Sequence, residues 1–229
     1  MSDPKAPPLY LQIADALLHD IAAGRLVEGE RLRPEREMAS DFGISVGTLR
    51  KALADLTAKG HLERRQGSGN YVRETRNAGG IYAFFRLELV TGGGQPSATV
   101  LSVDLMDKPE DAPGFGMSQR AHRIRRLRLL GGVPAVIEEI WLDHAWARTL
   151  SQDDLEGSLY HHYRSRLGLM ISRVEDRIGV AAMPNWGGLL PPGSACGFIE
   201  RLSWDQNGVP AEYSRNWFDP GVARYVSRI

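Results

Sequence analysis

Residues 34–56 read PEREMASDFGISVGTLRKALADL, a pattern typical of two short helices joined by a tight turn. Pro34 suits the start of the first helix, and Gly43 can take the left-handed conformation that a turn requires. Ser45 is a good N-cap for the second helix, which we expect to end near Gly60. The positions expected to face inward follow helical spacing: Met38, Ala39, Phe42, Leu49, Ala52, Leu53 and Leu56. The residues therefore predict a helix-turn-helix.

The flanking sequence adds an earlier helix and a hairpin. Between Leu9 and Ala23, apolar residues recur every three or four positions, which indicates an amphipathic helix. Strand-like segments at residues 62–65 and 71–73 flank the sequence QGSGN, which predicts a hairpin with a glycine-rich tip. We therefore expect a winged helix-turn-helix domain over residues 1–74.

Local charge in this domain favours a nucleic-acid partner. From Ser45 to Arg76 there are about seven Lys and Arg residues against three Asp and Glu residues, although the formal charge of the whole chain is zero. A helix can enter the major groove if small or hydrogen-bonding residues lie at its N-terminal end, as Ser45, Gly47 and Thr48 do here before Arg50. Two packed helices alone give a similar pattern, but the basic hairpin favours DNA binding.

Three segments resemble the N-terminal domain of GntR-family regulators: LRPEREMA (32–39), GISVGTLRKAL (43–53) and GSGNYV (67–72). The resemblance covers nearly all of residues 9–73. It implies that Arg36 contacts phosphate or a base. The implied major-groove residues are Ser45, Thr48 and Arg50, and the implied minor-groove residues are Gln66 and Gly67.

The chain departs from the usual family pattern at two places. It has Arg33-Pro34 where the family usually shows Pro-Ser, and it has Val46 where an arginine usually follows the serine. Because that arginine often reads guanine, the operator need not follow the family's commonest sequence.

The remainder of the chain is expected to be rich in strands. Residues 73–80 lack apolar periodicity and end in two glycines, so we place a linker at residues 75–80 and a second domain at residues 81–229. The expected strands are 81–90, 97–105, 121–130, 135–142, 171–180, 195–204 and 211–218, and the clearest helix is 158–167. The fold class is therefore α+β, with an antiparallel sheet in the second domain.

Short motifs in the second domain resemble the UTRA sensor domain of the HutC subfamily, whose fold is related to chorismate lyase. They are RLR (126–128), GGVP (131–134), SLY (158–160) and GVPAEYS (208–214). In UTRA domains that bind sugar phosphates, the equivalent serine, tyrosine and arginines hold the phosphate. The resemblance therefore implies that Ser158 and Tyr160 contact the effector.

The residue types also suit a small anionic ligand. Arg126 and Arg128 lie two positions apart on a strand, so they share a face and can clamp a phosphate or carboxylate. Glu138 and Glu212 can accept hydrogen bonds from ligand hydroxyls or amines, and Ser97 can add an anion contact beside a glycine-rich stretch. Without the resemblance, arginines on such a strand are better explained by solvation and salt bridges.

Other features narrow the class of protein. The single cysteine, Cys196, cannot form an internal disulfide, and no run of about 18 apolar residues could span a bilayer, so we expect a cytoplasmic protein that is not inserted in a membrane. The histidines lack the spacing of metal ligands, so we expect no metal and no cofactor.

These observations predict a DNA-binding transcription regulator, acting as a repressor and not as an enzyme. We expect a homodimer that binds an inverted repeat in double-stranded operator DNA and responds to a sugar phosphate or carboxylic acid. Two alternatives stay open. One is a chorismate-lyase-type enzyme with Glu138 as its acid or base, and the other is a dimeric DNA-binding protein that needs no ligand.

Overall fold

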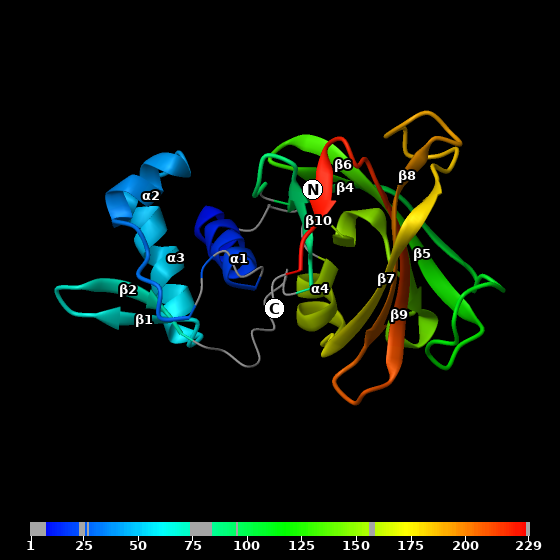
Figure 1. Cartoon of the computed structure of the whole chain (residues 1–229). Coiled ribbons are helices and arrows are strands. Elements are labelled where there is room, and N and C mark those ends of the chain that lie inside the picture. Colours follow the sequence, from blue (N-terminus) through cyan, green and yellow to red (C-terminus); the bar gives the residue numbers. More distant parts are fainter. Residues whose placement is uncertain are drawn as a thin grey trace. The chain divides into compact units, whose positions relative to one another are not determined.

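The computed structural model describes residues 8–22, 26, 28–73, 84–94, 96–155 and 159–227. Contacts group the chain into two compact units, Met1–Arg86 with Val226–Ile229 and Leu87–Tyr225 (Figure 1). The expected linker at residues 75–80 and the expected effector residue Ser158 lie outside the described residues.

The first unit is a winged helix-turn-helix, as the sequence predicts. Its elements are α1 (Leu9–Ala22), α2 (Glu35–Asp41), α3 (Val46–Ala58), β1 (Leu62–Arg65) and β2 (Gly69–Val72). Ser45 caps α3, because its side chain accepts a hydrogen bond from the backbone N–H of Thr48 at 3.1 Å. β1 and β2 pair antiparallel and form the wing.

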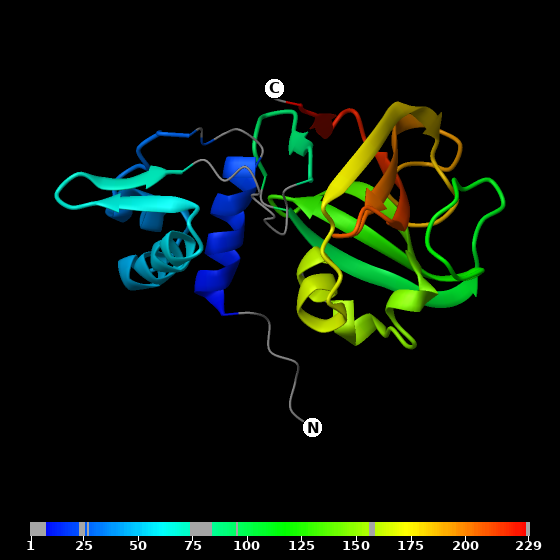
Figure 2. The same cartoon turned by 90° about the horizontal axis from the view of Figure 1, so that it is seen from below.

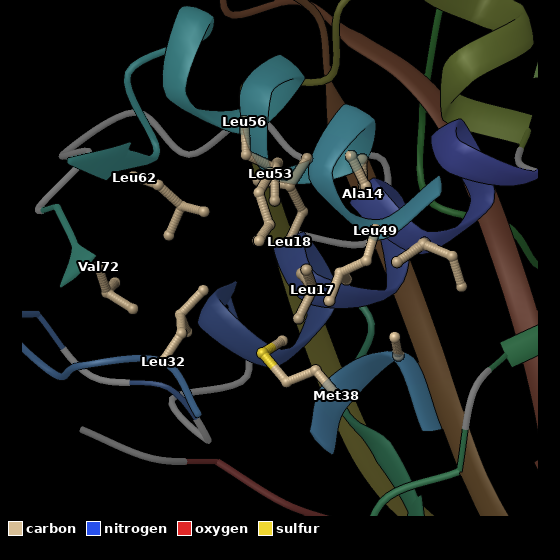
Figure 3. Packing of buried hydrophobic residues seen from close by; sticks show 13 residues of the cluster. Ala14, Leu17, Leu18, Leu32, Met38, Leu49, Leu53, Leu56, Leu62 and Val72 are labelled. Carbon is tan, nitrogen blue, oxygen red and sulfur yellow. The ribbon is translucent and has the colours of Figure 1, made fainter. Parts of the chain in front are cut away.

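One apolar core connects the helices of this unit to the wing. Figure 3 shows leucines of α1 and α3 pointing toward Met38 of α2 and toward Leu62 and Val72 of the wing. Of the positions expected to be buried, Met38, Ala39, Leu49, Ala52, Leu53 and Leu56 are buried and Phe42 is half-buried. Because Leu62 and Val72 belong to the same core, the base of the wing is held against α3.

The second unit is built on a six-stranded antiparallel sheet with the order β4-β5-β6-β9-β8-β7 (Figures 1 and 2). These strands are β4 (Pro96–Asp107), β5 (Arg120–Leu130), β6 (Val133–Asp143), β7 (Arg173–Ala182), β8 (Ala195–Trp204) and β9 (Pro210–Phe218). A separate antiparallel ribbon pairs β3 (Leu87–Leu89) with β10 (Ala223–Tyr225). This arrangement confirms the expected α+β class with an antiparallel sheet.

Short helical segments complete the second unit: η1 (His144–Trp146), η2 (Gln152–Leu155), α4 (Leu159–His162) and the π-helical η3 (Tyr163–Leu167). The helix expected over residues 158–167 is therefore α-helical only in its first part. It ends where Gly168 takes a φ of 66°, a left-handed conformation that commonly terminates helices.

Strand register gathers polar residues on one face of the sheet. Arg126 pairs with Glu138, which in turn pairs with Asn216, so all three side chains share this face. Glu212 lies four positions from Asn216 on the same strand and pairs with Ser203 of the neighbouring strand. We call this side of the sheet the polar face, and α4 lies against it through hydrogen bonds of Tyr160.

Replacing Gly197 with alanine should destabilise the second unit. A Cβ on Gly197 would overlap the ring of Phe218 on the paired strand, whereas a Cβ on Gly179 of β7 would meet nothing within 4 Å. Overpacking of this kind costs about 1–3 kcal/mol, so Gly197→Ala should lower the urea midpoint while Gly179→Ala should not. Equal midpoints for the two variants would contradict the packing described.

Candidate functional site

The N-terminal end of α3 displays the residues expected to enter the major groove. Ser45, Gly47 and Arg50 are exposed, and Thr48 is half-buried. The hydroxyl oxygens of Ser45 and Thr48 lie 2.9 Å apart and hydrogen-bond to one another. The residues expected to face bases therefore also stabilise the first turn of the helix.

Arg50 is joined to α2 by an ion pair. Its Nε lies 2.6 Å from Oε2 of Glu35, while its side chain stays 67% exposed. Arg36, the next residue of α2, is also exposed. Because an exposed ion pair contributes only about 0–1 kcal/mol, Glu35 can orient Arg50 without preventing its transfer to a phosphate or a base.

The tip of the wing is held by local contacts. Gly67 has a φ of 73°, and the N–H of Ser68 donates to the carbonyl of Arg65 at 3.0 Å. The guanidinium of Arg65 lies 4.2 Å from the ring centroid of Tyr71. Gln66 and Gly67 remain exposed at this tip, where a wing can approach a groove.

In the second unit, the two arginines of β5 converge on a carboxylate of the protein itself. Oε2 of Glu138 accepts from Nε of Arg126 at 2.9 Å and lies 2.6 Å from its Nη2, while Oε1 accepts from Nε of Arg128 at 2.6 Å. All three side chains are buried. The arginines share a face, as their spacing predicts, but they hold Glu138 between them.

The charge of Glu138 is fixed by these neighbours. Burial alone would raise its pKa, but the charges and hydrogen bonds of Arg126 and Arg128 lower the pKa from 4.5 to about 2. Glu138 is therefore ionised at neutral pH, with its oxygens occupied by guanidinium donors. A general acid or base works best with a pKa near the operating pH, so Glu138 is poorly suited to the enzymatic role considered above.

A second buried carboxylate, Glu212, meets the hydroxyls that cover the polar face. Its Oε1 accepts from Ser203 at 3.0 Å and from Tyr160 at 3.2 Å. Burial raises the pKa of Glu212 in spite of these hydrogen bonds. Burial, followed by the negative charge of Glu212, also raises the pKa of Tyr163 well above its ordinary value. Tyr163 is therefore a neutral hydroxyl close to an acceptor.

Three buried polar atoms in this region have no hydrogen-bond partner of normal geometry among the described residues. They are Nη1 of Arg126, the hydroxyl of Tyr163 and Oε2 of Glu212, and the side chains of Tyr163 and Glu212 also interact with each other. Because roughly nine in ten buried polar groups in proteins are hydrogen-bonded, incompletely satisfied atoms gathered in one place make this region the candidate ligand site. A cationic donor, a hydroxyl and a carboxylate acceptor complement a ligand that carries both acceptor oxygens and hydroxyl donors.

We call this set of residues the buried polar cluster: Arg126, Arg128, Glu138, Tyr160, Tyr163, Ser203 and Glu212. It contains five of the expected effector residues. Ser97 lies elsewhere, because it pairs with Leu129 and so points to the face opposite Arg128, where it is exposed. Sequence reasoning missed Tyr163, although its position three residues after Tyr160 places both on one side of a helix. It also missed Ser203, which only the pairing of β8 with β9 brings to Glu212.

The described ranges hold neither a candidate metal centre nor a helix that could span a membrane. Among those residues, no group of three or more His, Cys, Asp or Glu side chains is arranged to hold a metal ion. No described helix is both long enough and apolar enough to cross a membrane.

Comparison with known families covers both units. Residues 9–72 match the family "Bacterial regulatory proteins, gntR family", and residues 91–221 match the UTRA domain. The fold and these matches define a transcription regulator with a winged helix-turn-helix domain followed by a UTRA domain. The chain belongs to the GntR family and carries a UTRA domain.

Known proteins resemble the chain along nearly its whole length. The HTH-type transcriptional regulator SmoD of Agrobacterium fabrum is 53% identical over 225 residues, covering 97% of this chain and 96% of that protein. The mannosyl-D-glycerate transport/metabolism system repressor MngR of Escherichia coli is 31% identical, covering 93% and 92%. The crystal structure of the possible regulator YydK of Bacillus subtilis shares the fold, with a TM-score of 0.55, 23% identity and coverage of 96% and 98%.

Neutralising Glu138 should destabilise the protein in a pH-dependent way. Glu138→Gln leaves two buried guanidiniums without a counter-charge, which should cost about 3–5 kcal/mol at neutral pH. Because folding lowers the pKa of Glu138 from 4.5 to about 2, the stabilisation is complete above the unfolded value and disappears as the pH falls through the folded value. The difference in free energy of unfolding between wild type and Glu138→Gln should therefore shrink as the pH falls from about 5 to about 2.

The control is Glu139→Gln on the opposite face, where the partner Arg125 keeps 25% of its side chain exposed. The measurement is urea unfolding across this pH range. The control should lose less free energy of unfolding than Glu138→Gln does. If the difference in free energy of unfolding between wild type and Glu138→Gln does not change with pH, Glu138 does not have the lowered pKa described here.

Proposed function

We propose that the protein is a repressor whose affinity for operator DNA is controlled by a small anionic metabolite bound in the UTRA domain. The observation that carries the proposal is the set of three buried polar atoms on Arg126, Tyr163 and Glu212 that lack a hydrogen bond of normal geometry. They lie in the domain that follows the DNA-binding unit in the chain. In this view residues 1–74 bind DNA in the cytoplasm and residues 81–229 bind the effector.

The effector we propose is a sugar derivative that carries one acidic group. Its acidic oxygens would bind Nη1 of Arg126 and draw this guanidinium partly away from Glu138. Its hydroxyls would donate to Oε2 of Glu212 and bond to Tyr163, which a simple inorganic anion cannot do. The relative MngR is named for mannosyl-D-glycerate, a compound with both a carboxylate and sugar hydroxyls, so this compound is a suitable probe.

On the DNA side, we propose that α3 enters the major groove with Ser45, Gly47 and Thr48 toward the bases. Arg36 and Arg50 would contact phosphates or bases, and Gln66 and Gly67 would reach the minor groove. One recognition helix covers only a few base pairs, so two copies of the chain would bind an inverted repeat as a homodimer. Six of these seven residues are exposed, and Thr48 is half-buried.

Loss of the proposed DNA contacts should weaken operator binding. Arg36→Ala and Arg50→Ala should each cost about 1–3 kcal/mol per half-site and so act twice in a dimer. The control is Arg177→Ala, a residue of the second unit whose side chain is 73% exposed. The measurement is a titration of an inverted-repeat operator at physiological salt, and normal binding by either variant would show that the recognition surface lies elsewhere.

Replacing the residues that carry these buried polar atoms should weaken the effector response. Alanine at both Arg126 and Arg128 would leave Glu138 buried without a counter-ion, so we use the single changes Arg126→Gln and Glu212→Gln. A charge-assisted hydrogen bond contributes about 1.5–3 kcal/mol, so each variant should need roughly 10- to 100-fold more mannosyl-D-glycerate or glucose 6-phosphate to alter operator affinity.

The matched control for these variants is Arg125→Gln, whose side chain leaves the same strand on the opposite face and pairs with Glu139. Glucose serves as the uncharged ligand control. The proposal fails if wild-type operator affinity ignores both acidic probes, or if Arg126→Gln and Glu212→Gln respond as the wild type does.

A further inference from the structure

The β3–β10 ribbon is the part of the UTRA domain nearest in sequence to the DNA-binding unit. β3 is the first described strand after the wing, and its residue Leu87 pairs with Tyr225 of β10. The backbone N–H of Val226 then donates to the carbonyl of Arg86 at 2.8 Å, which continues the pairing by one step toward the preceding segment. The ribbon is therefore joined by backbone pairing to residues 84–86, the described residues that precede β3.

A buried ion pair attaches the ribbon to the edge of the main sheet. The hydroxyl of Tyr225 donates to Oδ2 of Asp176 on β7 at 2.8 Å. Asp176 also binds the guanidinium of Arg201 on β8 through two hydrogen bonds, of 2.6 and 2.7 Å. The side chains of Arg201 and Asp176 are only 13% and 8% exposed, so the pair is held within the domain. Such a two-pronged pair has a strongly preferred geometry.

The same arginine reaches the buried polar cluster. Arg201 and the hydroxyl of Tyr160 interact. Burial and the charge of Glu212 raise the pKa of Tyr160, and Arg201 opposes them; burial lowers the pKa of Arg201, but the hydrogen bond with Asp176 and then Tyr160 raise it. Tyr160 in turn donates to Oε1 of Glu212, the carboxylate whose other oxygen lacks a partner. Polar contacts therefore run without a break from the cluster to β10.

We name this set of residues the Tyr225 relay: Glu212, Tyr160, Arg201, Asp176 and Tyr225. We propose that the relay transmits effector binding at Glu212 to the β3–β10 ribbon and so to the DNA-binding unit. The inference rests on the proposed function, because it assumes that an effector donates to Oε2 of Glu212. Tyr225 and Asp176 are positioning residues in this scheme, since neither belongs to the cluster that would hold the effector.

The physical basis is a chain of hydrogen bonds that share one carboxylate. An effector hydroxyl that donates to Oε2 of Glu212 would weaken the hydrogen bond that Tyr160 donates to Oε1. Because a hydroxyl that donates less strongly is also a poorer acceptor, the contact that Tyr160 accepts from Arg201 would weaken with it. Arg201 is bonded twice to Asp176, so the two move together, whereas Tyr225 is attached to Asp176 by one neutral donor. This hydrogen bond between the ribbon and the main sheet is the link that a small displacement would break or strengthen.

The first test uses Tyr225→Phe, which removes only the hydroxyl. Operator binding without effector and mannosyl-D-glycerate binding without operator should each stay within about threefold of wild type. The factor by which saturating mannosyl-D-glycerate changes operator affinity should fall by about three- to tenfold. By linkage, the effect of operator on mannosyl-D-glycerate affinity should fall by the same factor, a reciprocal loss that simple destabilisation does not produce.

The matched control is Tyr213→Phe. Its hydroxyl also donates to a carboxylate, Glu200, at 2.6 Å, and it accepts from Arg215, but it lies outside the relay. This variant should keep the full response. An undiminished response in Tyr225→Phe, or an equal loss in both variants, would overturn the proposal.

A second test needs no effector and separates the relay from the proposed function. The hydroxyls of Tyr160 and Tyr225 are joined only through Arg201 and Asp176 in the scheme, so independent sites should give additive losses of Tm. The relay predicts that the losses are not additive. The Tm of the double variant Tyr160→Phe/Tyr225→Phe should fall by at least about 2 °C less than the sum of the two single losses. Tyr160→Phe with Tyr213→Phe should be additive.

The outcomes of the two tests are distinct. If the operator affinity of the wild type does not change with any acidic probe, but the Tm losses of the Tyr160 and Tyr225 variants are not additive, the proposed effector class is wrong and the relay is supported. A responsive wild type combined with additive Tm losses would overturn the relay and leave the proposed function standing.

Discussion

The buried contact of Glu138 with Arg126 and Arg128 is the constraint around which the UTRA domain is organised. Three charged side chains lie inside the protein within hydrogen-bonding distance, where none could remain ionised alone. Their mutual placement requires β5 and β6 to keep one register, because a shift by one residue would move Glu138 to the other face. The polar face therefore exists only while this contact is kept.

The contact also limits how an effector can bind. The guanidiniums are not an empty clamp, because both already donate to the carboxylate of Glu138. A ligand gains most where a partner is missing, at Nη1 of Arg126 and Oε2 of Glu212, and it must offer an acceptor to the first and a donor to the second. This requirement would favour hydroxylated acids over plain anions. Binding would also rearrange the contact between Arg126 and Glu138, which stabilises the fold.

Much of the winged helix-turn-helix could be predicted from the sequence, since its signals are local. The cap at Ser45, the turn at Gly43 and the helical spacing of Leu49 and Leu53 act over a few residues. The six strands of the main sheet were also predictable from their pattern, because they are bounded by turn residues. The ribbon was not: of the strand expected over residues 81–90, the described residues form a strand only at Leu87–Leu89, and β10 was not predicted. The shape of the helix after Tyr160 was less predictable, since π-helical backbone follows no simple sequence rule.

The details of the candidate effector site could not be predicted in the same way, because they depend on which strands are neighbours. β9 lies between β6 and β8 in the sheet, so Glu212 meets Ser203 only through an order of strands that differs from their order in the chain. Ser97 shows the converse error, since a residue close to Arg126 in the sheet can still point to the opposite face. Nothing in the sequence predicts that Asp176 and Arg201 are partners, because they meet only through the pairing of β7 with β8.

The most direct test of this account is to observe the Nε–H signals of Arg126 and Arg128 by nitrogen-15 NMR while mannosyl-D-glycerate is added. Without effector, both donors should exchange slowly with water, because Glu138 binds them in a buried site. The account predicts that saturating effector shifts both signals and leaves that of Arg125, which pairs with Glu139 on the other face, unchanged. Signals of Arg126 and Arg128 that stay fixed at a concentration that releases the operator would contradict it.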